Sequence, residues 1–355
     1  MSDIEEHRAP ERGNAGRRHG GDRSWWPVVR AWVAGLAVLA GLTVPLAAAT
    51  PAAAGDDHSR AYVTNFDSDT ASVINTRTNT VDTTIPVGDR PTYVAITPDG
   101  RRAYISNNNV DTVTVVDTKS NKVIDTIRAG DAPFEVAFTP DGRRAYVANF
   151  LGDNVSVINT KTNKIIATIP AGDGPAGVAI TPDGRRAYVT NENSDNVSVI
   201  DTKTNRVIAT TPVGNGPVGV ATTPDGRRAY VTNLLGDTVS VINTRTNTVT
   251  ATIPVGNGPA GVAITPDGRR AYVTNRDDDT VSVINTRTNT VTTIIPVGNG
   301  PVGVATTPDG RRAYVANENS DNVSVINTKI KEVTTTIGVG DRPFDVAITP
   351  QRPRG

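Results

Sequence analysis

Short runs of β-branched and aromatic residues, separated by tight-turn signals, recur along the chain from about residue 57 onward. The most regular stretch is TPDGRRAYVTN, which is complete at Thr181–Asn191. Its tyrosine recurs every 42 residues without insertion, at Tyr62, Tyr104, Tyr146, Tyr188, Tyr230, Tyr272 and Tyr314. A period in the forties that is built from short β runs is typical of propeller blades.

One repeat predicts four antiparallel strands, at residues 178–181, 186–190, 197–200 and 206–211. The first two are joined by Pro182-Asp183-Gly184, in which proline favours the start of a turn and glycine supplies a positive φ. A glycine-rich crossover at 213–219 then leads to the next repeat.

The ends of the array predict how the ring closes. The repeats begin at the second strand of a blade (residues 59–65) and end with a lone first strand (residues 344–349). Three strands at the front, six full sets of four and one strand at the back make 28, which is seven blades. We therefore predict an all-β, seven-bladed β-propeller over residues 57–350, with four antiparallel strands per blade, followed by a tail at 351–355. Its first blade is completed by the C-terminal strand in a 3+1 velcro closure.

The first 54 residues differ in kind from the repeats. A polar segment with several arginines precedes an apolar run from Ala31 to Ala49, and two Ala-Ala-Ala stretches follow. This order predicts an export signal that is cleaved at a small-residue site. An uncleaved membrane anchor is the alternative, because 19 residues can just span a bilayer.

The strings AYVTN and VSVINT, the TPDG turns and the GxGPxGVA crossovers resemble the YVTN-repeat family of seven-bladed β-propellers. The resemblance covers nearly all of residues 57–350. It implies the propeller fold and relatives among surface-layer-associated, secreted or periplasmic proteins of bacteria and archaea. For activity it implies an extracellular binding or scaffold role.

The amino-acid composition excludes most of the catalytic and cofactor chemistries that β-propellers carry. The chain has no cysteine, its three histidines are His7, His19 and His58, and its three tryptophans precede residue 33. The repeats therefore lack imidazole bases, His or Cys metal ligands and a stacking platform for a quinone cofactor. We expect no cofactor and no metal. A lactonase-like or other hydrolase that uses carboxylate and arginine chemistry at the channel mouth is the alternative function.

The crossovers carry the differences between copies that point to a site. Two residues after the crossover proline, four copies have glycine, whereas the copies in three adjacent blades have Tyr93, Glu135 and Asp345. Further large or charged residues gather on the same crossovers, at Asp89, Arg90, Asp131, Phe134, Asp341, Arg342 and Phe344. These ten residues form our hypothesis for a ligand or partner site at the channel mouth. The alternative is that they reflect the seam, since terminal repeats are atypical.

Two acidic features have structural interpretations. The last aspartate of the loop between the second and third strands recurs in every copy, from Asp69 to Asp321, and we interpret it as an Asx-type turn that holds its own backbone. The run Asp277-Asp278-Asp279 is rich in oxygen but lacks the spacing of a calcium loop.

Charge is balanced over the chain, with 36 lysines and arginines and 36 acids, but it is sorted by face. The face of the TPDGRR and NTRTNT turns (the turn face) carries 24 cations against 11 acids. The opposite face of loops and crossovers (the loop face) carries 18 acids, against which we count Arg90, Arg276 and Arg342. This sorting either keeps the protein soluble or lets the turn face contact an anionic surface.

The sequence thus predicts an exported, non-enzymatic binding or scaffold module that is secreted or associated with the cell envelope. Its partner is an envelope polymer, a protein or a small ligand, contacted through the acidic loop face and channel mouth. Nucleic acid is not expected, because no exposed aromatics are interleaved with the basic face. A monomer is favoured.

Overall fold

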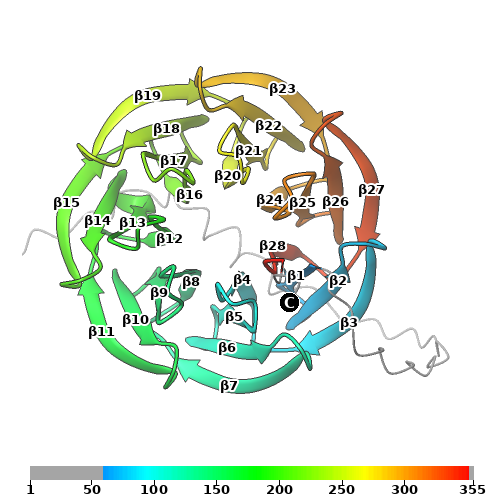
Figure 1. Cartoon of the computed structure of the whole chain (residues 1–355), viewed down its shortest axis with the longest axis horizontal. Coiled ribbons are helices and arrows are strands. Elements are labelled where there is room, and N and C mark those ends of the chain that lie inside the picture. The colour runs from blue at the N-terminus through cyan, green and yellow to red at the C-terminus, as the bar shows by residue number, and fades with distance from the viewer. Residues whose placement is uncertain (1–58, 352–355) are drawn as a thin grey trace, which may run out of the picture. The chain divides into compact units, whose positions relative to one another are not determined.

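The computed structural model describes residues 59–351. Within them, 28 strands form seven four-stranded antiparallel sheets arranged in a ring (Figure 1), and the axis around which the innermost strands stand is called the channel. The prediction of an all-β, seven-bladed propeller is confirmed. The predicted export segment at 1–54, and the tail apart from Gln351, lie outside the described residues.

The blades are numbered from the N-terminus, and their strands run from the channel outward. Blade 1 contains β28 (Pro343–Ile348), β1 (Arg60–Asn65), β2 (Thr70–Asn75) and β3 (Thr80–Pro86). Blade 2 contains β4 (Pro91–Ile96), β5 (Arg102–Asn107), β6 (Thr112–Asp117) and β7 (Lys122–Arg128). Blade 3 contains β8 (Pro133–Phe138), β9 (Arg144–Asn149), β10 (Asn154–Asn159) and β11 (Lys164–Pro170), and blade 4 contains β12 (Pro175–Ile180), β13 (Arg186–Asn191), β14 (Asn196–Asp201) and β15 (Arg206–Pro212). Blade 5 contains β16 (Pro217–Thr222), β17 (Arg228–Asn233), β18 (Thr238–Asn243) and β19 (Thr248–Pro254). Blade 6 contains β20 (Pro259–Ile264), β21 (Arg270–Asn275), β22 (Thr280–Asn285) and β23 (Thr290–Pro296). Blade 7 contains β24 (Pro301–Thr306), β25 (Arg312–Asn317), β26 (Asn322–Asn327) and β27 (Glu332–Gly338). A short 3-10 turn, η1 (Glu192–Ser194), lies in blade 4.

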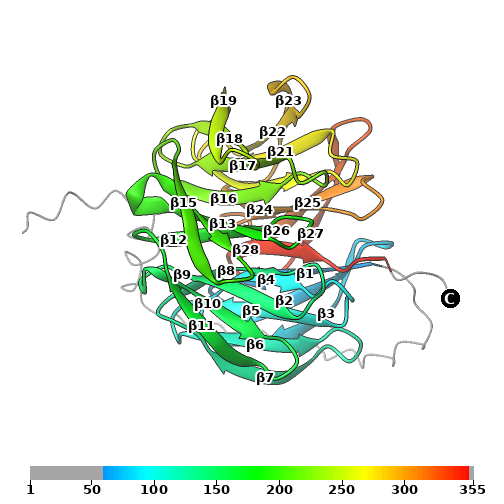
Figure 2. The ribbon, with the colours of Figure 1, turned by 60° about the vertical axis from the view of Figure 1, so that its left-hand side comes forward.

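The C-terminal strand closes the ring as predicted. β28 pairs antiparallel with β1, with Val346 opposite Val63, so that the first sheet has the order β28-β1-β2-β3. Figures 1 and 2 both show β28 in red beside β1 in blue. Each blade thus has the same four strands, and closure by β28 leaves no blade incomplete.

The core lies between neighbouring blades. The AYVTN strands are buried along nearly their whole length, whereas the outermost strands are largely exposed. Each blade interface holds one apolar cluster; at the first, Tyr62, Val73 and Ile85 pack against Val94 and Ile105 of blade 2. Burial of apolar surface at about 25 cal/mol per Å² is the main stabilising contribution, and here it couples every blade to the next.

The innermost strands begin earlier than the sequence predicts. β12 starts at Pro175 rather than at Val178, since a β-bulge between these two residues lets the strand continue through Gly177. The crossover that the sequence placed at 213–219 is correspondingly shorter, because Pro217 already belongs to β16. As a result Tyr93, Glu135 and Asp345 lie within the strands that line the channel.

The described residues contain no helix of the length and apolarity that crossing a membrane requires.

Candidate functional site

The ten residues predicted from the crossovers lie on one arc of the loop face. Asp89 and Arg90 precede β4, Asp131 precedes β8, and Asp341 and Arg342 precede β28. Tyr93 lies in β4, Phe134 and Glu135 in β8, and Phe344 and Asp345 in β28. Because β28, β4 and β8 are the inner strands of adjacent blades 1, 2 and 3 (Figure 1), the five residues within these strands come from one stretch of the ring's inner wall.

A continuous row of aromatic rings forms the centre of this arc. The ring of Tyr93 lies 5.6 Å from that of Phe134 and 5.5 Å from that of Phe344, between centroids. Phe66 extends the row at 6.0 Å from Phe344, and Phe150 extends it at 5.3 Å from Phe134. The four phenylalanines are buried and Tyr93 is partly exposed. Tyr93 is therefore the ring in the row that a ligand in the channel can reach.

Asp345 and Glu135 each reach across to the next blade. Asp345 Oδ2 accepts a bond from the backbone N–H of Val94 (3.0 Å), and Glu135 Oε2 accepts one from that of Val178 (2.9 Å). In an antiparallel pair, every second residue of a strand bonds to its partner strand. The Thr97 N–H bonds to Arg102 O of β5, so counting back along β4 the Val94 N–H points away from β5. These carboxylates thus bind donors on the free inner edge of the neighbouring strand.

The surroundings of these groups change their titration. Burial raises the pKa of Asp345 to about 7, although backbone bonds from Val94 and Val346 act in the opposite direction. Burial also raises the pKa of Glu135 well above its usual range, and the charge of Asp345 adds to the effect. Burial, with the charges of Glu135 and Asp345, raises the pKa of the Tyr93 hydroxyl. Near neutral pH this part of the wall can hold protons and donate hydrogen bonds.

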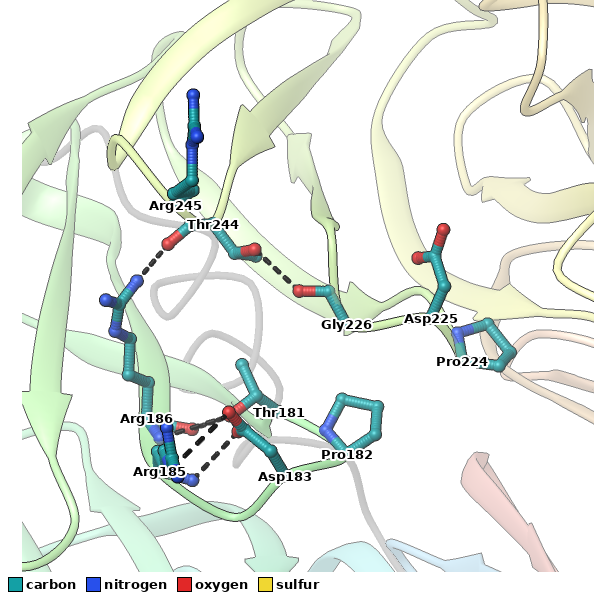
Figure 3. Close-up of a pocket in the computed structure, with 10 residues that line it drawn as sticks. All are labelled: Thr181, Pro182, Asp183, Arg185, Arg186, Pro224, Asp225, Gly226, Thr244 and Arg245. Carbon is teal, nitrogen blue, oxygen red and sulfur yellow. Dashed lines mark hydrogen bonds and ion pairs between the residues drawn. The ribbon is translucent and has the colours of Figure 1, made fainter.

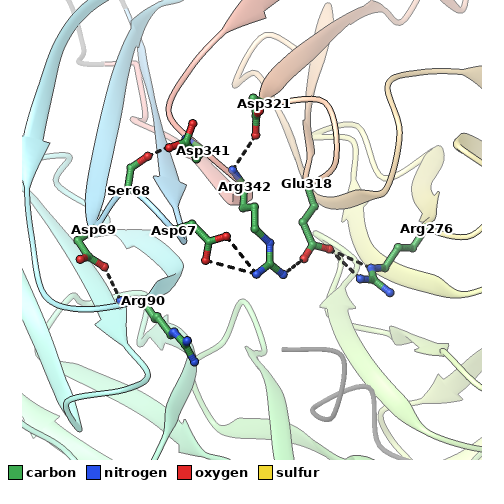
Figure 4. A network of polar contacts seen from close by, with 9 residues as sticks. All are labelled: Asp67, Ser68, Asp69, Arg90, Arg276, Glu318, Asp321, Asp341 and Arg342. Atoms are coloured by element: carbon green, nitrogen blue, oxygen red, sulfur yellow. Dashed lines mark hydrogen bonds and ion pairs between the residues drawn. The ribbon is translucent and has the colours of Figure 1, made fainter. Parts of the chain in front are cut away.

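A buried ion-pair network lies next to the aromatic row (Figure 4). The carboxylate of Glu318, with only 1% of its side chain exposed, accepts bonds from Arg276 Nε and Nη2 (3.0 and 2.9 Å) and from Arg342 Nη2. Arg342 also contacts Asp67 at 3.3 Å. Burial opposes the charge of Arg342, but its bonds to Glu318 and Asp67 prevail and raise its pKa. The network therefore fixes Arg342 in its charged form.

Arg90 differs from Arg342 although both precede an inner strand. Its guanidinium lies 5.5 Å from the centre of the Phe66 ring, over which Arg342 also lies at 4.9 Å. Within residues 59–351 no acidic side chain makes an ion pair with Arg90, and in Figure 4 its guanidinium stands apart from the network. Arg90 is therefore a partly exposed cation at the channel mouth whose charge is not neutralised by a direct partner.

The backbone at Arg90 is also costly. Arg90, Ala132 and Arg342 have φ values of 52°, 52° and 53°, where the other four crossovers place glycine. A side chain in this left-handed region costs about 1–2 kcal/mol. The three non-glycine residues coincide with the three blades of the arc.

Asp89, Asp131 and Asp341 lie on the outer part of the loops. Asp89 Oδ2 accepts a bond from Asn109 Nδ2 (2.5 Å), and the Asp341 N–H donates to Ser68 Oγ (2.7 Å). Asp131 and Asp341 are exposed.

The recurring loop aspartate is structural, but it acts differently from the predicted Asx turn. Asp69 Oδ1 accepts a bond from the Arg90 N–H (2.9 Å), 21 residues further on, and Asp321 does the same for Arg342 (2.9 Å). The same bond is present in all seven copies. In the other five, a crossover backbone N–H donates to Oδ1 of Asp111, Asp153, Asp195, Asp237 or Asp279. Each aspartate therefore anchors the crossover that follows its own blade.

Sequence reasoning missed Phe66, Phe150, Arg276 and Glu318. They share one position, the first residue of the loop between the second and third strands, which also holds Asn108, Glu192 and Leu234. The variety of residue types at this position was the available signal. Charge counting also missed Arg128, an exposed arginine at the loop-face end of β7.

The residues described contain no cluster of three or more His, Cys, Asp or Glu that could hold a metal ion. The aspartates of the Asp277–Asp279 run bind the backbone of two different crossovers. Asp278 Oδ2 accepts from the Asn257 N–H (2.7 Å), and Asp279 Oδ1 accepts from the Gly300 N–H (2.8 Å).

The fold and the channel-wall site define a class, that of seven-bladed propellers with a specialised arc at the channel mouth. The model of the YNCE-like beta-propeller family matches residues 26–146 and 141–228, which is more than half of the chain. The chain therefore belongs to the YNCE-like beta-propeller family. The model of a lactonase with a seven-bladed beta-propeller matches residues 202–341, a range that excludes Tyr93, Glu135 and Asp345. No curated protein matches the chain.

Solved structures support the fold. A protein of unknown function from Desulfotomaculum acetoxidans is 20% identical, with 82% of this chain and 99% of that chain covered and a TM-score of 0.72. A protein from Bacteroides uniformis, provisionally assigned as a 6-phosphogluconolactonase, is 18% identical, with 82% and 100% covered and a TM-score of 0.72. Hydrazine synthase from Kuenenia stuttgartiensis is 23% identical, with 72% and 88% covered and a TM-score of 0.67.

Proposed function

We propose that the protein is an exported, non-enzymatic binding module of the cell envelope, and that it takes its ligand at the arc formed by blades 1 to 3. The ligand is an organic anion, either a small molecule or the end of a longer chain, with a flat apolar part next to the charge. Its anionic group meets Arg90, and its apolar part meets the exposed edge of Tyr93.

The observation that carries this proposal is the state of Arg90. It keeps a left-handed backbone that four other copies assign to glycine, and its guanidinium has no ion-pair partner among residues 59–351. Retaining such a residue against a cost of about 1–2 kcal/mol is typical of functional positions. The buried rings of Phe134 and Phe344 hold the neighbouring Tyr93 in place, so that the site is preformed.

Benzoate is a suitable probe, because it combines a carboxylate with a flat ring. Calorimetric titration of the wild type should show binding that Arg90→Gly weakens at least about tenfold, the effect expected for loss of one charge-assisted bond. Glycine suits the φ of 52°, so the variant should keep its stability. Arg128→Gln, which removes one charge elsewhere on the loop face, is the matched control. Benzoate affinity that is unchanged in Arg90→Gly would refute the assignment.

Export is the second element of the proposal. It is supported by the order of polar, apolar and alanine-rich segments in residues 1–54. Expression in a bacterial host should place the protein outside the cytoplasm, with an N-terminus near residue 55 by Edman sequencing. Recovery of the full-length chain from the cytoplasm alone would contradict it.

A lactonase-like hydrolase is the second candidate. It is favoured by the raised pKa of Asp345, about 7, and by the proximity of Glu135 and Tyr93, which together could move a proton at the channel wall. The test is hydrolysis of 6-phosphogluconolactone by the wild type and by Asp345→Asn. Activity that Asp345→Asn abolishes would establish the hydrolase, and activity no greater than the spontaneous rate would dismiss it.

A further inference from the structure

The turn face carries a repeated pair of arginines whose two members have different roles. The second of each pair bridges to the next blade: Arg102 Nη1 donates to Thr160 O (2.6 Å), and Arg270 Nη1 donates to Thr328 O (2.9 Å). Arg60 makes the same bond to Thr118 O (3.0 Å). These guanidiniums are fixed between blades. Their partners are neutral carbonyls, so their charge persists.

The first arginine of each pair is free to move. The side chains of Arg143 and Arg185 are 85% and 84% exposed, and their nearest acid is the aspartate two residues earlier, at 3.9 and 4.0 Å. That aspartate is held by its other oxygen, since Asp183 Oδ1 accepts from Thr181 Oγ1 (2.6 Å) and from the Arg185 N–H (3.0 Å), and only Oδ2 faces the guanidinium, at 4.0 Å. Exposed ion pairs of this length contribute little, so the guanidinium remains available to a partner.

Grooves between adjacent blades bring the two kinds of cation together. One groove, of about 510 Å³, lies between blades 4 and 5, and Arg185, Arg186 and Arg245 line it (Figure 3). A second groove of about 370 Å³ lies between blades 6 and 7, with Arg270 in its wall. A third of about 180 Å³ lies between blades 7 and 1, with Arg77 and Arg312. The three grooves lie at three blade interfaces of the same face, and the second and third are at neighbouring interfaces.

We propose that this face binds a linear polymer that carries regularly repeated phosphate groups, laid across successive grooves. The charge excess of 13 on the turn face supplies the attraction, and the groove walls supply fixed arginines that a flat lipid surface cannot reach. Among the described turns on this face, Ile330 is the one large apolar side chain that is well exposed, so a membrane finds little to insert. Asp183 and Asp225 also line the groove between blades 4 and 5, which keeps the affinity for a single phosphate low. Binding therefore depends on many contacts at once.

Long-chain inorganic polyphosphate is the probe, and the whole protein is titrated with it at low and high salt. The double variant Arg185→Gln/Arg245→Gln should bind about tenfold more weakly, with a shallower dependence on salt. The control, Arg128→Gln, removes one charge from the loop face outside both proposed sites and should bind as the wild type does. The single variant Arg245→Gln, which removes one charge from a groove, should bind more weakly. Orthophosphate should show no measurable binding.

Three outcomes would overturn the proposal: equal weakening by Arg245→Gln and Arg128→Gln, binding that does not respond to salt, or orthophosphate binding as tight as that of the polymer. Binding to phosphatidylglycerol vesicles that matches polyphosphate binding and depends on Arg185 would overturn it in favour of a lipid surface. None of these results bears on benzoate binding at Arg90, so the two proposals fail separately.

Discussion

The hydroxyl of Tyr314 donates a hydrogen bond of 2.6 Å to Oδ1 of Asn79, and this bond joins the last blade to the first. The same tyrosine-to-asparagine bond links blades all around the ring, as in Tyr62 to Asn121 (2.6 Å) and Tyr188 to Asn247 (2.8 Å). One copy breaks the rule. Lys331 occupies the place of the asparagine opposite Tyr272, and the buried Tyr272 hydroxyl has no hydrogen-bond partner in the described part of the chain.

Lys331→Asn should therefore stabilise the protein. It restores the missing bond, worth about 1 kcal/mol, and asparagine tolerates the φ of 60° at this position better than lysine does. Urea unfolding measures the gain. The gain should disappear when Lys331→Asn is made in a Tyr272→Phe background, and a gain that persists there would mean that the bond is not its cause.

Ala132→Gly should also stabilise the fold, by about 1 kcal/mol, because it removes a Cβ from a left-handed residue. The backbone bond from its N–H to Asp111 Oδ1 (2.9 Å) is unaffected. Gly174→Ala, at the equivalent crossover of blade 4, is the reverse change and should lower the free energy of unfolding. A loss of stability in Ala132→Gly would show that the methyl group packs more favourably than its backbone strain costs.

Asp345 should make stability depend on pH. Its folded pKa of about 7 exceeds the usual unfolded value, so the proton is held more tightly in the folded state. The stability that this provides is full below about pH 4 and is lost as the pH rises to 7, by up to about 4 kcal/mol. Asp345→Asn should therefore be more stable than the wild type at pH 8 and no more stable at pH 4. Asp341→Asn, a change at an exposed aspartate, is the control; a constant difference across this range for Asp345→Asn would contradict the account.

Glu318 should be required for folding stability. Glu318→Gln leaves Arg276 and Arg342 close together without their shared carboxylate, and we expect a loss of about 3 kcal/mol. Asp67→Asn acts at the exposed end of the same network and should cost less than about 1 kcal/mol. Thermal unfolding of the two variants compares these effects. Similar losses in both would show that burial does not distinguish the two carboxylates.

The architecture was predictable because each copy repeats the same local signals. The sequence has a fixed spacing of 42 residues, TPDG turns and a lone last strand. A seven-bladed ring with 3+1 closure is the arrangement that agrees with all three signals. The position of the arc was predictable for the same reason, since Tyr93, Glu135 and Asp345 replace glycine in copies that must be adjacent once the ring closes.

The partners of these residues were not predictable. The bond from Asp345 to Val94 N–H joins residues 251 positions apart, and it depends on the register of two inner strands. Likewise, the contact of Arg276 with Glu318 requires that loop positions 42 residues apart face each other across a blade interface. The 21-residue reach of Asp69 to the next crossover was mistaken for a local turn, because an Asx turn and a longer bond use the same residue type.

Backbone amide chemical shifts, followed during a benzoate titration, locate the ligand site residue by residue. Shift changes should gather on the loop face of blades 1 to 3, at Phe66, Arg90 and Tyr93, and at Glu135 and Asp345 on the channel wall. In Arg90→Gly they should vanish. Shift changes confined to the TPDGRR turns, or none at saturating benzoate, would contradict the claim that the channel mouth is the ligand site.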